Sequence, residues 1–255
     1  MLLSNLCKTY IGDEGKGIPL VLVHGFLGSS EMWRPQIDFF KDYFRVITPD
    51  LPGYGKSNKA KSHNSIQSIA NLLLDCLEEK KIDKFYLLGH SMGGMIVQEM
   101  AKKGGDNISK LVCYSTGPRG EMPGRFETVD QSRENLKKKG LEITAKNIAK
   151  TWFIKGKDAK YFDICIEAGK QTSIETADNS LVAIKNWNGV DTLKNIKSET
   201  LIIWGDQDKS YNLEQIQTLE NNIKNSKLII FKNCAHNVHL EKIDQFNQTI
   251  KDFLI

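Results

Sequence analysis

The stretch Lys84-Phe85-Tyr86-Leu87-Leu88-Gly89-His90-Ser91-Met92-Gly93-Gly94 decides the fold that we predict for this 255-residue chain. Its first half is a short apolar run rich in β-forming residues, and apolar residues at helical spacing follow it. The pattern G-x-S-x-G between a strand and a helix is typical of a nucleophile elbow, a sharp turn that lifts a serine hydroxyl clear of a sheet. The sequence therefore predicts a nucleophilic Ser91 at the end of a buried strand.

The spacing within this stretch follows from the geometry of such a turn. Gly89 and Gly93 leave space where a Cβ would strike the neighbouring turn, and Ser91 is expected in a strained backbone conformation. A helix that begins near Met92 would direct its free N–H groups and the positive end of its dipole toward a developing oxyanion.

Bulk properties fit one large α/β domain that carries an insertion. The hydrophobic content of 40% and charged content of 26% are ordinary for a soluble globular protein. A net charge of +4 is too small to indicate a nucleic-acid partner. No segment is long and apolar enough for a membrane span, and none has the order of a signal peptide. We expect no membrane partner.

The cysteines are scattered, odd in number and without C-x-x-C spacing, which predicts reduced buried thiols and a cytoplasmic location. They are Cys7, Cys76, Cys113, Cys165 and Cys234.

Alternating strand and helix patterns with short loops predict an α/β fold, with a mostly parallel central sheet and helices on both faces. An edge strand is expected over 5–11, followed by a glycine-rich turn over 12–17. The further strands are expected at 20–23, 45–48, 84–88, 110–115, 200–204 and 227–231. Core helices are expected at 32–43, 66–80, 92–104, 212–224 and 241–253.

The pattern changes between Pro118 and Asn188, where no run is typical of a buried parallel strand. Four amphipathic helical patterns cover 126–139, 141–154, 158–170 and 174–187. We therefore predict that residues 118–188 form a helical cap, or lid, inserted into a core made of residues 1–117 and 189–255.

A serine hydroxyl becomes a good nucleophile only when a base takes its proton, and that base needs an acid to orient it. In folds with this elbow, the acid and then the histidine follow the serine on loops after late strands. Asp206 and Asp208 follow one late strand, and His236 and His239 follow the last. We predict His236 as the base and Asp208 as the acid. Asp206 is the rival acid, better suited to capping its loop, and His239 is a rival base better suited to a structural role.

These landmarks together resemble the α/β-hydrolase superfamily, in the group with a helical cap after the sixth strand. They are His24-Gly25-Phe26, Asp50 to Ser57, Gly89 to Gly94, Gly205 to Asp208 and Ala235-His236. The resemblance implies that the backbone N–H groups of Phe26 and Met92 form an oxyanion hole. Families of this type begin with a longer antiparallel hairpin, so the first strand is expected to be truncated. The histidines lack metal-ligand spacing, so we expect neither a metal nor a cofactor.

The predicted cap should shape a substrate pocket. The candidate apolar walls, which cap-to-core packing would explain as well, are Met95, Met122, Phe126, Trp152, Phe153, Trp187 and Tyr211. Residues 118–170 hold 12 Lys and Arg against 8 Asp and Glu. Arg119, Arg125 and Arg133 therefore offer sites for a carboxylate-bearing substrate, although such side chains on helices are often only solvated.

The function that these residues predict is hydrolysis of a small carboxylic ester or lactone through an acyl-enzyme on Ser91. The resemblance also allows hydrolysis of a carbon–carbon bond in a vinylogous diketone, or a related elimination of pyruvate. The pyruvate-eliminating relatives carry an arginine four positions after the serine, where this chain has Met95. A serine at the elbow argues against dehalogenases and epoxide hydrolases, which place aspartate there. A non-catalytic ligand receptor is the alternative from another class, and the complete Ser–Asp–His set argues against it. The sequence leaves the natural substrate and the oligomeric state open.

Overall fold

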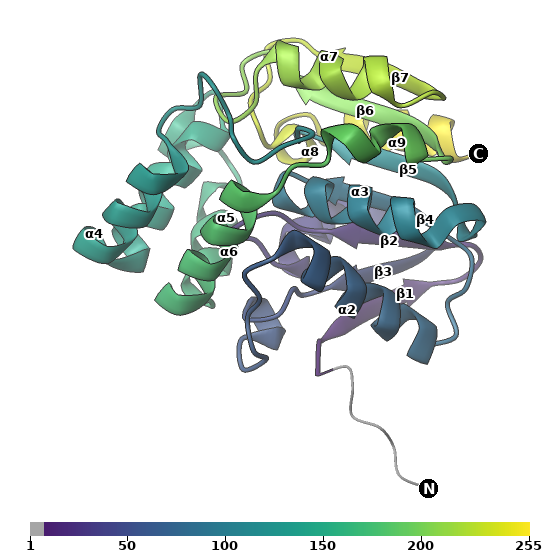
Figure 1. Ribbon diagram of the computed structural model, residues 1–255, viewed down its shortest axis with the longest axis horizontal. Helices are drawn as coiled ribbons and strands as arrows, with labels where there is room; N and C mark the ends of the chain where they lie inside the picture. The colour runs from purple at the N-terminus through teal and green to yellow at the C-terminus, as the bar shows by residue number, and fades with distance from the viewer. Residues whose placement is uncertain (1–7) are drawn as a thin grey trace, which may run out of the picture.

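The computed structural model describes residues 8–255, and in these residues one seven-stranded sheet forms the centre of the molecule (Figure 1). The strands are β1 (Ile11–Gly15), β2 (Pro19–Val23), β3 (Arg45–Pro49), β4 (Phe85–His90), β5 (Ile108–Tyr114), β6 (Glu199–Gly205) and β7 (Ser226–Phe231). Their order across the sheet is β1-β3-β2-β4-β5-β6-β7. β1 runs antiparallel to β3, and every other pair is parallel.

Helices occupy the connections between the strands. They are α1 (Arg34–Phe40), α2 (Ile66–Glu79), α3 (Met92–Gly104), α4 (Val129–Ala149), α5 (Phe162–Lys170), α6 (Ile174–Asn186), α7 (Leu213–Asn222), α8 (Val238–Glu241) and α9 (Ile243–Leu254). The short 3₁₀ helices are η1 (Ser30–Trp33), η2 (Gly55–Ser57), η3 (Gly105–Asn107), η4 (Lys150–Trp152), η5 (Gly156–Asp158) and η6 (Val190–Asn195). The segment expected as one helix over 32–43 is thus divided between η1 and α1, and the terminal helix between α8 and α9.

The sheet has an apolar core on each face. Side chains of a strand alternate between faces, so Val21 belongs to one core cluster and Leu22 to the other. α2, α3 and α7 contribute to the first cluster, whereas α1 and α9 contribute to the second. This arrangement confirms the predicted mostly parallel sheet with helices on both faces.

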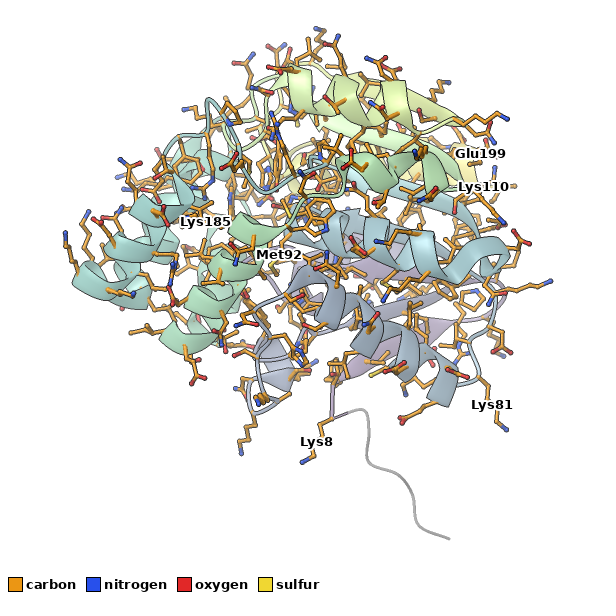
Figure 2. The ribbon with its side chains drawn as sticks, viewed as in Figure 1. Lys8, Lys81, Met92, Lys110, Lys185 and Glu199 are labelled. Carbon is orange, nitrogen blue, oxygen red and sulfur yellow. The ribbon has the colours of Figure 1, made fainter. Side chains whose placement is uncertain are left out.

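Charged residues sit where the strands begin, away from the buried run. Lys110 of β5 and Glu199 of β6 are partners in the parallel register, and their side chains form an ion pair of 2.6 Å (Figure 2). The remainder of β5 and of β6 is mostly apolar and buried, because helices cover both faces of the sheet. The carboxyl ends of the strands are therefore left to the loops that carry polar residues.

The first strand differs from the prediction. β1 is Ile11–Gly15, so it shares only Ile11 with the predicted strand and otherwise lies in the segment predicted as a turn; residues 8–10 are not a strand. Residues 5–7 of the predicted strand lie outside the described residues. An edge strand needs backbone pairing more than apolar side chains, and the two acidic residues of β1 find arginine partners. Asp13 pairs with Arg45 at 2.6 Å, and Glu14 pairs with Arg34 at 2.8 Å.

Helices α4, α5 and α6 lie together beside the sheet, on the left in Figure 1. They follow β5, the fifth strand of the described chain rather than a sixth. The two patterns expected at 126–139 and 141–154 form α4, whose halves meet at Gly140 with φ 77° and ψ 173°. The boundaries 118 and 188 of a separate cap domain stay a prediction.

Two chain segments connect these helices to the sheet, and they run side by side. Arg119 forms an antiparallel bridge with Asn188. The Gly120 N–H donates to the Trp187 carbonyl at 2.9 Å, and the Gly189 N–H donates to the Pro118 carbonyl at 2.8 Å. We call residues 118–120 and 187–189 the neck.

The cysteines only partly follow the prediction. Cys113, Cys165 and Cys234 are free and buried, as expected. Cys76 is disulfide-bonded, so the prediction of a reduced thiol is wrong at that position. None of the helices within residues 8–255 has the length and apolar content that a membrane crossing requires.

Candidate active site

Ser91 occupies the tight turn between β4 and α3. Its backbone has φ 57° and ψ −118°, a conformation that L-residues rarely adopt. A Cβ at Gly89 or at Gly93 would lie 2.3 Å from a backbone oxygen, so only glycine allows the strand and helix to approach this closely. The turn is held by hydrogen bonds from the Ser91 N–H to the Tyr114 carbonyl at 3.0 Å and from Thr116 Oγ1 to the Ser91 carbonyl at 2.8 Å.

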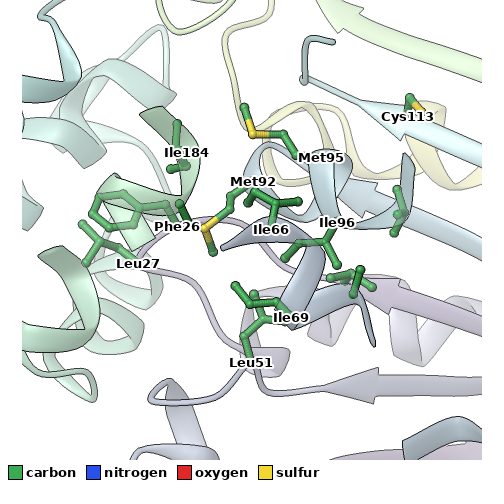
Figure 3. Close-up of a cluster of buried hydrophobic side chains, with 14 of the residues drawn as sticks. Phe26, Leu27, Leu51, Ile66, Ile69, Met92, Met95, Ile96, Cys113 and Ile184 are labelled. Carbon is green, nitrogen blue, oxygen red and sulfur yellow. The ribbon is translucent and has the colours of Figure 1, made fainter. Parts of the chain in front are cut away.

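Two backbone N–H groups beside this turn have no acceptor among the described residues. Met92 is the first residue of α3, so its N–H has no partner within the helix. Phe26 lies in the loop after β2, and its N–H is likewise free. The side chains of Phe26 and Met92 belong to one apolar cluster with Ile184 of α6 (Figure 3). The free N–H groups are those that the sequence singled out for an oxyanion hole.

His236 and Asp208 form a buried pair. His236 Nδ1 lies 2.9 Å from Asp208 Oδ2, and their side chains are 2% and 0% exposed. The other carboxylate oxygen accepts the backbone N–H groups of Ser210 at 2.7 Å and Tyr211 at 3.3 Å. These bonds fix the carboxylate so that one oxygen faces the imidazole.

The loop that carries His236 is braced from several sides. The backbone carbonyl of His236 accepts a hydrogen bond from the Tyr114 hydroxyl at 2.9 Å, and the ring of His90 lies 4.6 Å from the His236 imidazole. Glu241 of α8 accepts the Ala235 N–H at 2.7 Å and the Ile154 N–H at 2.7 Å. Sequence patterns did not single out Glu241 or Tyr114, because their roles depend on segments distant in sequence.

The two rival residues lie elsewhere. Asp206 accepts the Cys234 N–H at 3.4 Å and lies 3.8 Å from Lys232, so it braces its loop rather than an imidazole. His239 is fully buried, with Nδ1 3.0 Å from the Tyr114 hydroxyl. Burial and the neighbouring His236 lower the pKa of His239 to about 3. It is therefore neutral at physiological pH.

His24 and His90 are also buried beside the site. Burial lowers the pKa of both, although Asp50 opposes the shift for His24. His24 Nε2 accepts the Leu51 N–H at 3.0 Å. His90 Nε2 lies 3.3 Å from the His236 carbonyl, so both histidines brace loops. The described residues contain no cluster of three or more metal-ligating side chains.

Ser91 and His236 line one cavity of about 30 Å³. Its other walls are Phe26, Met122, Arg125, Ile148, Trp152, Ile184, Ser210 and Tyr211. No hydrogen bond joins the Ser91 and His236 side chains in the described structure, and the Ser91 side chain lies near the Tyr211 hydroxyl. The Tyr211 ring stacks on the imidazole at 5.9 Å and 13°. Burial raises the pKa of Tyr211, and bonds to Ser91 and Thr116 oppose that rise.

The predicted pocket walls divide into two groups. Met122, Trp152 and Tyr211 line the cavity. The other candidates, Met95, Phe126, Phe153 and Trp187, do not. Met95 is fully buried in the core under α3, and the indole N–H of Trp187 donates to Glu99 at 2.9 Å. Helical periodicity identifies buried apolar residues but does not tell a cavity wall from a core contact, which is why Ile148 and Ile184 were not found.

The three arginines considered for substrate binding have different surroundings. Arg133 forms a two-point ion pair with Asp178, at 2.7 and 3.0 Å. Arg119 contributes its backbone to the neck. It lines neither the cavity at Ser91 nor the neighbouring cavity that Arg125 also borders. Arg125 lines the cavity at Ser91.

Comparison with known proteins gives a family match over most of the chain. The family described as alpha/beta hydrolase fold matches residues 18–243. The solved structure of the enol-lactonase from Burkholderia xenovorans superposes with a TM-score of 0.88 at 22% identity, covering 96% of each chain. That likeness concerns the fold.

Two curated proteins are similar along nearly their whole length. The pimeloyl-[acyl-carrier protein] methyl ester esterase of Legionella pneumophila is 30% identical, covering 96% of this chain and 98% of its own. The 2-hydroxy-6-oxononadienedioate/2-hydroxy-6-oxononatrienedioate hydrolase 1 of Pseudomonas putida is 31% identical, covering 94% of this chain and 89% of its own.

Proposed function

The chain belongs to the α/β hydrolase fold family, and from that premise we propose that it is a serine hydrolase that cleaves a small carboxylic ester or lactone. The single observation that carries the proposal is the cavity that Ser91 shares with His236, whose Nδ1 lies 2.9 Å from Asp208. A strained serine, a buried histidine–carboxylate pair and two free N–H groups are the parts that acyl transfer needs. The similarity to a methyl ester esterase supports the same bond type.

In the proposed reaction, Ser91 attacks the carbonyl carbon while His236 takes the hydroxyl proton. Asp208 keeps the proton of His236 on Nδ1, so that Nε2 is free to accept. The carbonyl oxygen becomes an oxyanion that the N–H groups of Phe26 and Met92 stabilise, a contribution of about 2.7–4 kcal/mol for each such donor. The leaving alcohol then takes the proton from His236, and water repeats the sequence on the acyl-enzyme.

Tyr211 does not act as the base in this proposal. Burial raises the pKa of its hydroxyl, so the phenol stays protonated near neutral pH. In the resting site the Ser91 side chain lies near the Tyr211 hydroxyl and makes no hydrogen bond with His236. The hydroxyl must turn away from Tyr211 toward His236 for the reaction, a rotation about one side-chain bond.

Substrate entry requires movement. The cavity at Ser91 has about 30 Å³, far less than the roughly 300 Å³ of the smallest ordinary ligand pockets. An ester reaches Ser91 only when side chains of the helical segment, or the helices themselves, move outward. Loops and lids of this kind open on the microsecond to millisecond timescale.

Hydrolysis of a carbon–carbon bond is the second candidate. The observation that favours it is the 31% identity to the P. putida hydrolase. The same three residues serve both reactions, and the difference lies in the electrophile. A vinylogous diketone offered as substrate separates the two, because its cleavage removes a strongly absorbing dienol.

The proposal is tested by hydrolysis of p-nitrophenyl esters from acetate to octanoate, with Ser91→Ala as the control. We expect turnover that falls by about 10⁴-fold or more in the variant, as removal of a serine nucleophile does elsewhere. The preferred chain length gives the length of the acyl site. Cleavage of the vinylogous diketone without cleavage of any ester or lactone would replace the proposal with the second candidate.

A further inference from the structure

Arg125 is the cation that lines the cavity at Ser91, and only some of the N–H donors of its guanidinium have acceptors. Nη1 donates to the Glu127 carbonyl at 2.6 Å and to Ser132 Oγ at 3.0 Å. An arginine has five N–H donors, two of them on Nη1. The donors on Nε and Nη2 have no acceptor among the described residues. The donors on Nε and Nη2 point in the same direction and can bind a carboxylate through two parallel hydrogen bonds.

The acidic residue next to Arg125 is engaged elsewhere. The Glu127 carboxylate accepts Ser132 Oγ at 2.5 Å on one oxygen and Asn135 Nδ2 at 2.9 Å on the other. Within residues 8–255, Arg125 forms no ion pair with a carboxylate. By contrast, Arg133 on the same segment donates from Nε and Nη2 to the Asp178 carboxylate.

The position of the guanidinium is fixed although its charge is uncompensated. Its centre lies 4.2 Å above the ring of Phe126. Burial lowers the pKa of Arg125, but not far enough to remove the charge of a guanidinium. Arg125 is partly buried and no carboxylate of the described chain forms an ion pair with it, so removing its charge from water carries a cost. A ligand carboxylate would compensate that cost.

Arg125 also borders a second, larger cavity. This outer cavity has about 330 Å³, and it shares Met122 and Arg125 with the cavity at Ser91. Its other walls are Gly120, Glu121, Pro123, Thr128, Val129, Asp130 and Lys185. Lys185 is paired with Asp130 at 2.7 Å, so Arg125 is the cation there that remains open to a ligand.

We propose that Arg125 binds a carboxylate at the far end of the substrate's acyl chain, so that the preferred substrates are half-esters or lactones of dicarboxylic acids. The scissile carbonyl lies at Ser91, and the acyl chain extends past Met122 to the free side of the guanidinium. This inference rests on the proposed function, because it names the substrate class of the same site. It also explains the size of the closed cavity, since Arg125 and Met122 separate the nucleophile from the outer cavity.

The test compares charged with neutral esters of similar length. The probes are the p-nitrophenyl half-esters of succinate, glutarate and adipate, and the p-nitrophenyl esters of butyrate, valerate and hexanoate. The measured quantity is the ratio of kcat/KM for the best charged ester to that for the neutral ester of like length. In Arg125→Gln we expect this ratio to fall roughly 10- to 100-fold, the loss of one charge-assisted pair. Most of the fall should appear in KM.

Two variants control the measurement. Arg119→Gln removes a nearby cation that lines neither cavity, and we expect it to keep the ratio of the unaltered protein. Arg125→Lys keeps the charge but not the two-point geometry, and we expect an intermediate ratio. An unchanged ratio in Arg125→Gln, or an equal fall in Arg119→Gln, would overturn the inference while the hydrolase function stood.

A binding measurement separates this inference from the proposed function. Calorimetry on Ser91→Ala with glutarate should give saturable binding that Arg125→Gln abolishes in the double variant. If no ester is cleaved but this binding is found, the hydrolase proposal fails and the carboxylate site stands. Absence of binding, together with equal turnover of charged and neutral esters, refutes the carboxylate site.

Discussion

At Ser91 the backbone φ of 57° places a non-glycine residue in a region that costs about 1–3 kcal/mol. The surrounding hydrogen bonds hold it there, because Tyr114 and Thr116 bind its N–H and carbonyl from the neighbouring strand end. The strain has a consequence for chemistry. The turn places Ser91 in the cavity that His236 also lines, and α3 begins at Met92, whose N–H is free.

The acid can be tested by a pair of matched variants. In Asp208→Asn the carboxylate that faces His236 Nδ1 becomes an amide, which favours the wrong imidazole tautomer. We expect ester kcat to fall about 10⁴-fold, as for the corresponding change in serine proteases. Asp206→Asn changes a residue that faces its own loop, and we expect less than a tenfold effect. Equal losses in both variants would contradict the assignment.

Tyr211 gives a second prediction at this scale. Tyr211→Phe keeps the ring that stacks on His236 and removes the hydroxyl that lies near Ser91. Because the raised pKa keeps the phenol neutral, we expect kcat/KM to change by less than about tenfold, far below the 10²–10⁴-fold effect of a general base. The pH–rate profile should keep the same limbs. Loss of a limb in Tyr211→Phe would assign Tyr211 a catalytic proton transfer.

Single residues differ in how far the sequence predicts them. Ser91, Asp208 and His236 follow strand ends in a fixed order, so their placement together was predictable. The free side of Arg125 was not predictable, because it depends on the Glu127 carboxylate being bonded by Ser132 and not by the arginine. Such preferences among polar partners arise only once the helices pack.

At the scale of elements, the neck ties α4–α6 to the sheet. A Cβ at Gly120 would lie 1.5 Å from the Ile184 carbonyl oxygen, a contact that no side-chain rotation relieves. The backbones of residues 118–120 and 187–189 therefore approach as closely as glycine permits. This close pairing fixes where the helical segment sits over Ser91.

Gly120→Ala should therefore destabilise the protein by several kcal/mol, the mark of a backbone clash. Gly169→Ala is the matched control in α5. Its Cβ would lie 3.4 Å from the Cβ of Ala145, an ordinary contact. We expect it to be neutral or to stabilise by about 0.4–1 kcal/mol. Urea denaturation measures both, and similar stabilities for the two variants would show that the neck can rearrange.

Elements with strong periodicity were predictable, and weakly patterned ones were not. α2 was expected at 66–80 and is Ile66–Glu79, because its apolar stripe and the Ser65 cap define both its face and its start. β1 was misplaced because pairing with β3 and ion pairs to Arg34 and Arg45, rather than apolar alternation, determine where it forms. Those partners are 20 or more residues away, beyond the reach of a local pattern.

Across the whole molecule, buried histidines connect the site to stability. His24, His90 and His239 all have lowered pKa values in the folded state, mainly through burial. Below the ordinary value of 6.5 the unfolded chain binds protons that the folded chain does not. The free energy of unfolding therefore falls as the pH drops below about 6.5, by up to about 1.4 kcal/mol per pH unit for each histidine.

This prediction is checked by urea denaturation between pH 7.5 and pH 4.5. His239→Gln removes one of these buried histidines, so the slope of stability against pH should be smaller by about one proton in that variant. Because the pKa of His239 is about 3, its contribution extends over the whole acid side of this range. An identical slope in the variant would mean that His239 takes up its proton while the protein is folded.

The central claim about the whole protein is that Ser91 is its nucleophile, and this claim rests on the closed cavity and on the family match. Covalent labelling with a fluorophosphonate, followed by mass spectrometry of the peptides, tests it most directly. We predict a single adduct on Ser91, lost in Ser91→Ala and slowed in His236→Ala. An adduct on another residue, or no adduct in the intact protein, would contradict the proposed mechanism.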